Sequence, residues 1–152
     1  MMEGVDEKDK ALMNLMQNYF PISAHPYEEI AEKVGLDKNS VISRLKRLNK
    51  KGIIRKVGAI VSAREIGFVS LLAATKVPEN QIEEAAKIIN SYRGVTHNYL
   101  RSGILNIWFT LTEPNQELLD QHLKEIENKI NSKIIRLPAQ KIYKIGVKFD
   151  IR

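Results

Sequence analysis

Cysteine is absent from this 152-residue sequence, and so are long apolar runs. The lack of cysteine excludes disulfide bonds, thiolate catalysis and cysteine-based zinc or iron–sulfur sites, and it fits a cytoplasmic protein. No apolar stretch reaches the length that a membrane-spanning helix needs. The first ten residues, MMEGVDEKDK, are too polar for a signal peptide. We therefore expect a cytoplasmic protein without a membrane segment.

Basic residues outnumber acidic residues in this chain. Lys and Arg number 24 against 18 Asp and Glu, so the formal net charge is +6 and the pI is about 9.5. This excess favours an anionic partner, either nucleic acid or a small molecule rich in carboxylates. Hydrophobic residues make up 43% of the sequence, which is enough for one or two small domains with buried cores.

The first part of the chain, residues 1–65, has the pattern of a small helical domain. Apolar residues recur at helical spacing in 6–18 and 27–34, and Asp37 is placed to cap a third helix that runs through Leu48. Residues 53–61 then alternate like a short strand. This order predicts a winged helix-turn-helix domain with a β-wing.

The second part, residues 66–152, alternates between strand and helix patterns. Strands are expected at 69–77, 95–101, 105–111 and 134–145, and helices at 81–91 and 116–131. The βαββαβ order is that of the ferredoxin-like fold, in which two helices cover one face of a four-stranded antiparallel sheet. The whole chain is therefore expected to be α+β.

The other face of that sheet needs a covering. Apolar residues expected on it are Leu71, Ala73, Ile107 and Phe109. A large apolar patch is unusual on a monomer, so we expect a homodimer or a heterodimer with a paralogous subunit.

The stretch from Gly94 to Thr110, GVTHNYLRSGILNIWFT, is the most informative part of the second domain. A period of two places His97, Tyr99 and Arg101 on one face of a strand, with Trp108 on the strand that should pair beside it. A core strand would carry apolar residues at these positions. An imidazole, a phenol and a guanidinium beside an aromatic ring suit a large, flat, polyanionic ligand.

The order of domains and several motifs resemble known families. A helix-turn-helix followed by βαββαβ resembles the Lrp/AsnC family of transcription factors over almost the whole chain. Those regulators usually carry an acidic Gly-Asp-Tyr-Asp-like turn between the second and third strands, whereas RSGILN at 101–106 contains no acid. RKVGAI at 55–60, Arg64, GF at 67–68, HNYLR at 97–101 and NIWFT at 106–110 together resemble siroheme decarboxylases. Leu105 departs from that pattern, in which an aromatic residue is expected.

The resemblance implies a carboxy-lyase that removes carbon dioxide from two acetate side chains of siroheme and gives 12,18-didecarboxysiroheme. It implies Arg64 and Arg101 as carboxylate clamps, His97 and Tyr99 as proton donors, Trp108 as an apolar wall and Asn106 as a further substrate contact. A second role for His97, as axial ligand of the siroheme iron, stays open. No cofactor beyond that iron and no metal site in the protein are expected.

A DNA-binding regulator with a small-molecule or heme effector is the alternative. Basic residues of the third helix that fit phosphate contacts are Lys38, Arg44, Lys46, Arg47, Lys50 and Lys51. Only Asn39 and Ser40 are placed to read bases at its start. We rank this alternative second and expect any DNA binding to be vestigial. His25 and His122 are expected to be structural or solvent-facing.

Overall fold

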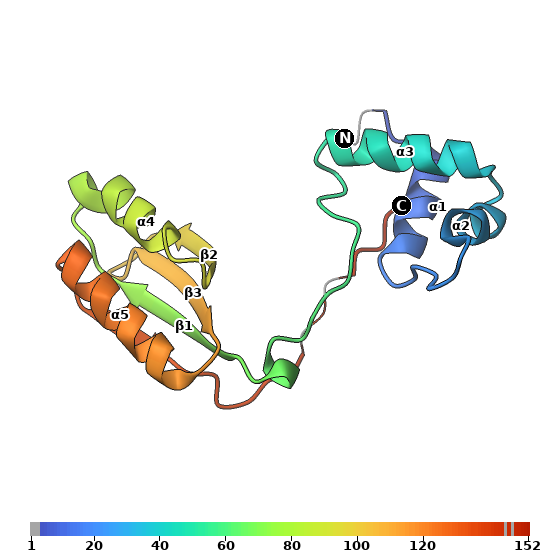
Figure 1. Ribbon diagram of the computed structural model, residues 1–152. Helices are drawn as coiled ribbons and strands as arrows, with labels where there is room; N and C mark the ends of the chain where they lie inside the picture. Colours follow the sequence, from blue (N-terminus) through green and yellow to red (C-terminus); the bar gives the residue numbers. More distant parts are fainter. Residues whose placement is uncertain (1–3, 145, 147) are drawn as a thin grey trace. The chain divides into compact units, whose positions relative to one another are not determined.

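The computed structural model describes residues 4–144, 146 and 148–152, and it divides the chain into two units (Figure 1). One unit contains the described residues up to Ala59 together with those from Lys144 onward. The other unit contains Ile60–Tyr143. The division by contacts thus lies a few residues before the predicted boundary at 65, and it groups the last described residues with the N-terminal unit.

Three helices form the N-terminal unit: α1 (Glu7–Met16), α2 (Pro26–Val34) and α3 (Lys38–Lys50). Asp6 caps α1 and Asp37 caps α3, because each carboxylate accepts a hydrogen bond from a backbone N–H of the first turn. Gly35 ends α2 in the left-handed conformation that glycine adopts without a steric penalty. The core joins the apolar stripes of the three helices, with Leu12, Ile30, Ala31, Val34, Val41 and Leu45. The three predicted helices are confirmed.

A short extended segment near the end of the chain lies against α1. The side-chain amide of Gln17 accepts from the N–H of Phe149 at 2.7 Å and donates to its carbonyl at 2.9 Å. The amide of Asn14 bonds to the backbone of Ile151 in the same way, at 3.1 and 2.9 Å. Residues i and i+2 of an extended chain present their backbone groups on the same edge, so two amides one helical turn apart can bind both.

The predicted β-wing is wrong. Residues 53–61 contain no strand, and every residue from Arg55 to Val61 is exposed. The backbone N–H groups of Ile53 and Ile54 donate to Leu48 O and close the end of α3 instead. A strand needs a neighbouring strand for its backbone groups, and no strand among the described residues pairs with this segment. The side-chain amide of Asn49 donates to the carbonyls of Ile54 and Arg55 instead.

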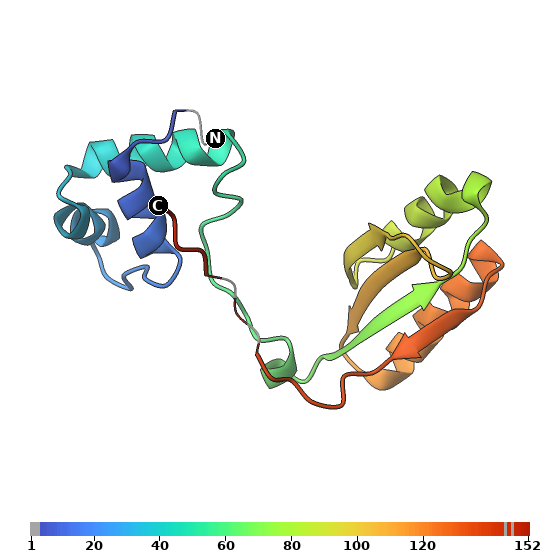
Figure 2. The ribbon, with the colours of Figure 1, turned by 180° about the vertical axis from the view of Figure 1, so that it is seen from behind.

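The second unit is a four-stranded antiparallel sheet with two helices on one side, as Figures 1 and 2 show. Its elements in chain order are β1 (Val69–Thr75), α4 (Ile82–Asn90), β2 (Val95–Leu100), β3 (Ile107–Glu113), α5 (Gln116–Ile130) and β4 (Ile134–Leu137). Short 3₁₀ turns, η1 (Arg64–Ile66) and η2 (Glu79–Gln81), precede β1 and α4. The strand order is β2-β3-β1-β4. The predicted α+β class and βαββαβ order are confirmed.

The strand predicted at 134–145 is shorter than expected. β4 ends at Leu137, and Pro138, which lacks the N–H that a ladder needs, follows it. The predicted end, Ile145, lies outside the described residues. No helix of the described chain is both long and apolar enough to cross a membrane.

The face of the sheet that packs against α4 and α5 is the opposite of the one expected. Leu71, Ala73, Ile107 and Phe109 are buried in one cluster with helix residues such as Ile89 and Leu123. They are therefore core residues, and the expectation that they form an open dimer face is wrong. A period of two separates the two faces of a strand, but it does not say which face the helices cover.

The face without helices carries a different set of residues. Burial alternates along β3, so Trp108, Thr110 and Thr112 are only partly buried between fully buried neighbours. Leu72 and Ile135 lie on the same face through their registers with Thr110 and Ala74. They are 41% and 46% exposed. This open face combines apolar surface on β1 and β4 with polar and aromatic side chains on β2 and β3.

Candidate active site

The predicted row of functional side chains comes together on the open face. Tyr99 of β2 stands directly opposite Trp108 of β3, and His97 stands opposite Thr110. The rings of His97 and Tyr99 are stacked with centroids 6.1 Å apart, and both side chains are exposed. Strand pairing therefore places an imidazole, a phenol and an indole on one surface, in the arrangement that the alternation of the sequence predicts.

His97 is held at one of its ring nitrogens. Its Nδ1 lies 3.1 Å from the hydroxyl of Thr96, the preceding residue. No hydrogen-bond partner of Nε2 occurs among the described residues. The nitrogen that lies across the ring from Thr96 is thus available to a ligand, either as a proton donor or as a lone pair.

Arg101 follows β2 and turns its side chain over the indole. Its Cζ lies 5.3 Å from the ring centroid of Trp108, within the range of a cation–π contact. The indole is itself fixed, because its Nε1–H donates to Leu105 O at 2.8 Å. The guanidinium pairs with no carboxylate in the described part of the chain. Arg101 is therefore placed to bind a carboxylate from outside.

Asn106 anchors the loop that carries Arg101. Its side-chain amide accepts from the N–H of Val77 at 2.9 Å and donates to the carbonyl of Val77 at 2.7 Å. The N–H of Arg101 donates to Asn106 O at 2.8 Å. Both ends of the amide are thus used within the protein. Asn106 positions the loop, and its direct contact with a substrate stays a prediction.

Arg64 does not join this group. It lies in η1, before the start of β1, with an exposed side chain. Arg101 follows the end of β2, and β2 runs parallel to β1 because each is antiparallel to β3. The two arginines therefore lie near opposite ends of the sheet, separated by the length of the seven-residue strand β1, about 20 Å.

The other two histidines lie away from the row. His25 precedes α2 and is exposed, with Nδ1 3.7 Å from Glu28. His122 of α5 contacts buried Glu113 at 2.7 Å on the helix side of the sheet. The alternating pattern of β3 could have predicted that Glu113 is buried, but it could not have predicted that His122 is its partner. No group of three or more potential ligands that could hold a metal occurs within the described ranges.

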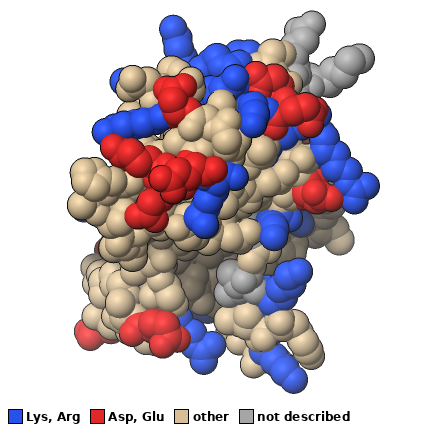
Figure 3. All heavy atoms as spheres, turned by 90° about the vertical axis from the view of Figure 1, so that its right-hand side faces the viewer, with Lys and Arg blue, Asp and Glu red and all other residues tan. Residues whose placement is uncertain are grey.

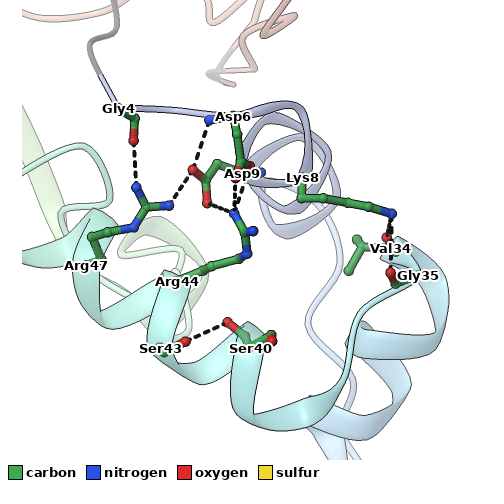
Figure 4. Close-up of polar contacts among 10 residues, drawn as sticks. All are labelled: Gly4, Asp6, Lys8, Asp9, Val34, Gly35, Ser40, Ser43, Arg44 and Arg47. Atoms are coloured by element: carbon green, nitrogen blue, oxygen red, sulfur yellow. Dashed lines mark hydrogen bonds and ion pairs between the residues drawn. The ribbon is translucent and has the colours of Figure 1, made fainter.

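The basic helix α3 is largely paired with acidic side chains of its own unit (Figure 4). Arg44 contacts Asp6 at 2.7 Å and Asp9 at 2.8 Å, and Arg47 pairs with the second oxygen of Asp9. Asp9 is fully buried, which raises the pKa of its carboxyl, but hydrogen bonds from both guanidiniums outweigh burial and leave the pKa below its ordinary value.

Two further polar residues of α3 are also engaged. Lys38 pairs with Glu28 at 2.7 Å, and the hydroxyl of Ser40 donates to the capping carboxylate of Asp37. On the face drawn in Figure 3, Asp and Glu side chains lie between Lys and Arg side chains. The charge available for DNA phosphates is therefore smaller than a count of basic residues predicts.

Comparison with known proteins separates two families that share this fold. Residues 65–144 match the model of the AsnC-like ligand binding domain, and residues 9–55 match that of the siroheme decarboxylase NirDL-like HTH domain. The siroheme decarboxylase alpha subunit of Desulfovibrio desulfuricans is 40% identical over 145 residues, which cover 95% of this chain and 84% of that subunit.

Two solved structures extend the comparison. The siroheme decarboxylase NirDL, in complex with an iron-uroporphyrin III analogue, superposes with a TM-score of 0.72 at 27% identity, covering 93% of this chain and 47% of that one. This chain thus spans about half the length of NirDL. The leucine response regulatory protein LrpA of Mycobacterium tuberculosis superposes with a TM-score of 0.77 at 18% identity, covering 97% of this chain and 99% of LrpA, a likeness of fold alone. Sequence and both domain matches together place this chain in the siroheme decarboxylase family, on an Lrp/AsnC scaffold.

Proposed function

We propose that this chain is a subunit that removes carbon dioxide from two acetate side chains of siroheme, which leaves methyl groups and gives 12,18-didecarboxysiroheme. The observation that carries the proposal is the row of His97, Tyr99, Trp108 and Arg101 on the open face of the sheet. Membership of the family supports it, since named relatives are siroheme decarboxylase subunits.

Arg101 and Trp108 bind the substrate. The guanidinium of Arg101 holds a carboxylate that does not react, through two parallel hydrogen bonds. The indole gives the macrocycle an apolar surface and keeps water from the reacting acetate, whose loss of carbon dioxide is favoured in a dry environment. Arg64 serves a carboxylate on a different edge of the macrocycle, because it lies at the other end of the sheet.

His97 supplies the proton. When the bond to the carboxyl carbon breaks, its electron pair stays on the methylene carbon and carbon dioxide leaves. A proton from Nε2 of the imidazolium then completes the methyl group. Tyr99, stacked on His97, is a second donor within the same row. The iron belongs to the substrate, whose macrocycle delocalises the transient electron pair, and we propose no further cofactor.

A second subunit, identical or paralogous, covers the apolar half of the open face. Leu72 and Ile135 expose large apolar side chains beside the polar row. Their burial against another subunit would remove water from the neighbourhood of Trp108 and so complete the dry site. The second subunit is therefore part of the active site in this proposal.

Anaerobic incubation with siroheme tests the function. The chain, alone and with a co-expressed paralogue, should shift the absorption bands of siroheme, and mass spectrometry should detect the loss of two carbon dioxide molecules. Absence of binding and of product under both conditions would refute the proposal. A DNA footprint at a defined site that survives physiological salt would favour the regulator instead.

A further inference from the structure

An irregularity in β2 determines which way His97 points. Val95 pairs with Leu111 and His97 pairs with Thr110, so Thr96 is an extra residue without a partner in β3. Val95 packs against the core. In an uninterrupted strand, His97 would share the face of Val95, because side chains alternate with a period of two. The β-bulge at Thr96 reverses this phase and brings His97 to the open face.

The same extra residue contacts the ring that it redirects. Thr96 Oγ1 lies 3.1 Å from His97 Nδ1, while the ring of Tyr99 stacks on the imidazole at an interplanar angle of 25°. The imidazole is thus restrained by a hydrogen bond at one nitrogen and by an aromatic ring on one face. When its oxygen accepts from Nδ1–H, the hydroxyl favours the protonation states that carry a proton on Nδ1, which are the imidazolium and the Nδ1–H tautomer.

We propose that Thr96 is a positioning residue for the reaction, which fixes Nδ1 of His97 and thereby makes Nε2 the nitrogen that faces siroheme. This inference rests on the proposed function. After the Nε2 proton has passed to the methylene carbon, the remaining proton sits on Nδ1 and is donated to Thr96 Oγ1. The hydroxyl therefore stabilises the tautomer that proton transfer leaves behind.

Matched substitutions separate this role from a general effect on the strand. Thr96→Val removes the hydroxyl and keeps the β-branched shape, whereas Thr96→Ser keeps the hydroxyl. Thr110→Val makes the same chemical change directly opposite His97. The imidazole ¹⁵N shifts of His97 in the free protein report the tautomer without any substrate.

We expect an excess of the Nδ1–H tautomer in the wild type, reduced by about five- to tenfold in Thr96→Val, since one hydrogen bond is lost. Thr96→Ser and Thr110→Val should resemble the wild type. Turnover should fall by a similar factor in Thr96→Val and recover in Thr96→Ser. A tautomer ratio that Thr96→Val leaves unchanged, or a wild-type excess of Nε2–H, would overturn the inference. A wild type that fails to bind siroheme would refute the proposed function, and the tautomer measurement would stand apart from that failure.

Discussion

Two surfaces of this molecule carry arginine side chains and use them in opposite ways. On α3, Arg44 and Arg47 pair with Asp6 and Asp9 of the same unit. On the sheet, Arg101 lies over Trp108 and has no carboxylate partner among the described residues. Net charge alone would favour α3 as the anion-binding surface. Internal pairing reverses that ranking, because a guanidinium already neutralised by buried acid has little to offer a phosphate.

Replacement of His97, which lies on the sheet surface beside Arg101, should have the largest effect on activity. We expect His97→Ala to lower turnover of siroheme on the order of a hundredfold while binding is retained, because the proton donor is lost and the carboxylate contacts remain. Steady-state rates and absorption titrations measure the two effects. His25→Ala, at an exposed histidine outside the sheet, is the control and should be neutral.

A changed iron spectrum in His97→Ala would assign the residue as an axial ligand. An unchanged rate together with an unchanged spectrum, in an assembly where this subunit holds the working site, would contradict both roles.

Replacement of Arg101 tests binding rather than chemistry. Arg101→Ala should weaken siroheme binding by roughly ten- to a hundredfold, since one charge-assisted carboxylate contact contributes about 1.5–3 kcal/mol. Arg93→Ala removes an exposed arginine just before β2 and serves as the matched control. Equal affinities of the two variants in an absorption titration would show that the loss of charge, and not its position, governs binding.

Replacement of Asp9 tests the pairing of the two arginines on α3. Asp9→Asn should lower the stability of the N-terminal unit by about 1–2 kcal/mol, because two arginines lose a charged partner. Hydrogen exchange of α1 and α3 amides measures this. Asp120→Asn, which breaks the exposed pair with Arg136, should cost much less.

The pH dependence of stability tests the same pairing, and its direction follows from the pKa of Asp9. The pKa of Asp9 is lowered in the folded protein, so its contribution to stability is present above its unfolded pKa of about 3.9 and is lost as the pH falls below that value. Stability of the N-terminal unit should therefore decline in acid for the wild type and less steeply for Asp9→Asn. Parallel curves for the two proteins would show that Asp9 does not carry this dependence.

Local patterns predicted the elements and part of the site well. The cap at Asp37 and the placement of His97 and Tyr99 on one face of β2 depend on neighbouring residues, and both are found as expected. Patterns of this kind need only the spacing of a helix or a strand.

Features that depend on distant partners could not be predicted in the same way. The prediction of a β-wing was wrong because residues 53–61 have no strand to pair with in the described part of the chain. The prediction of the open face was wrong because only packing decides which face of the sheet α4 and α5 cover. The contacts of Asn106 with Val77 and of Arg47 with Asp9 join residues far apart in sequence. Spacing along the chain carries no signal for such pairs.

The bonds from Asn14 and Gln17 to Phe149 and Ile151 also have a consequence for synthesis. The three helices leave the ribosome before any strand of the sheet, yet the segment that completes their outer surface is translated after the last one. At 5–20 residues per second, the nascent helical unit waits for about 5–20 s with both amides unoccupied by their backbone partners. Its final hydrogen bonds are thus formed only after the sheet unit has been made.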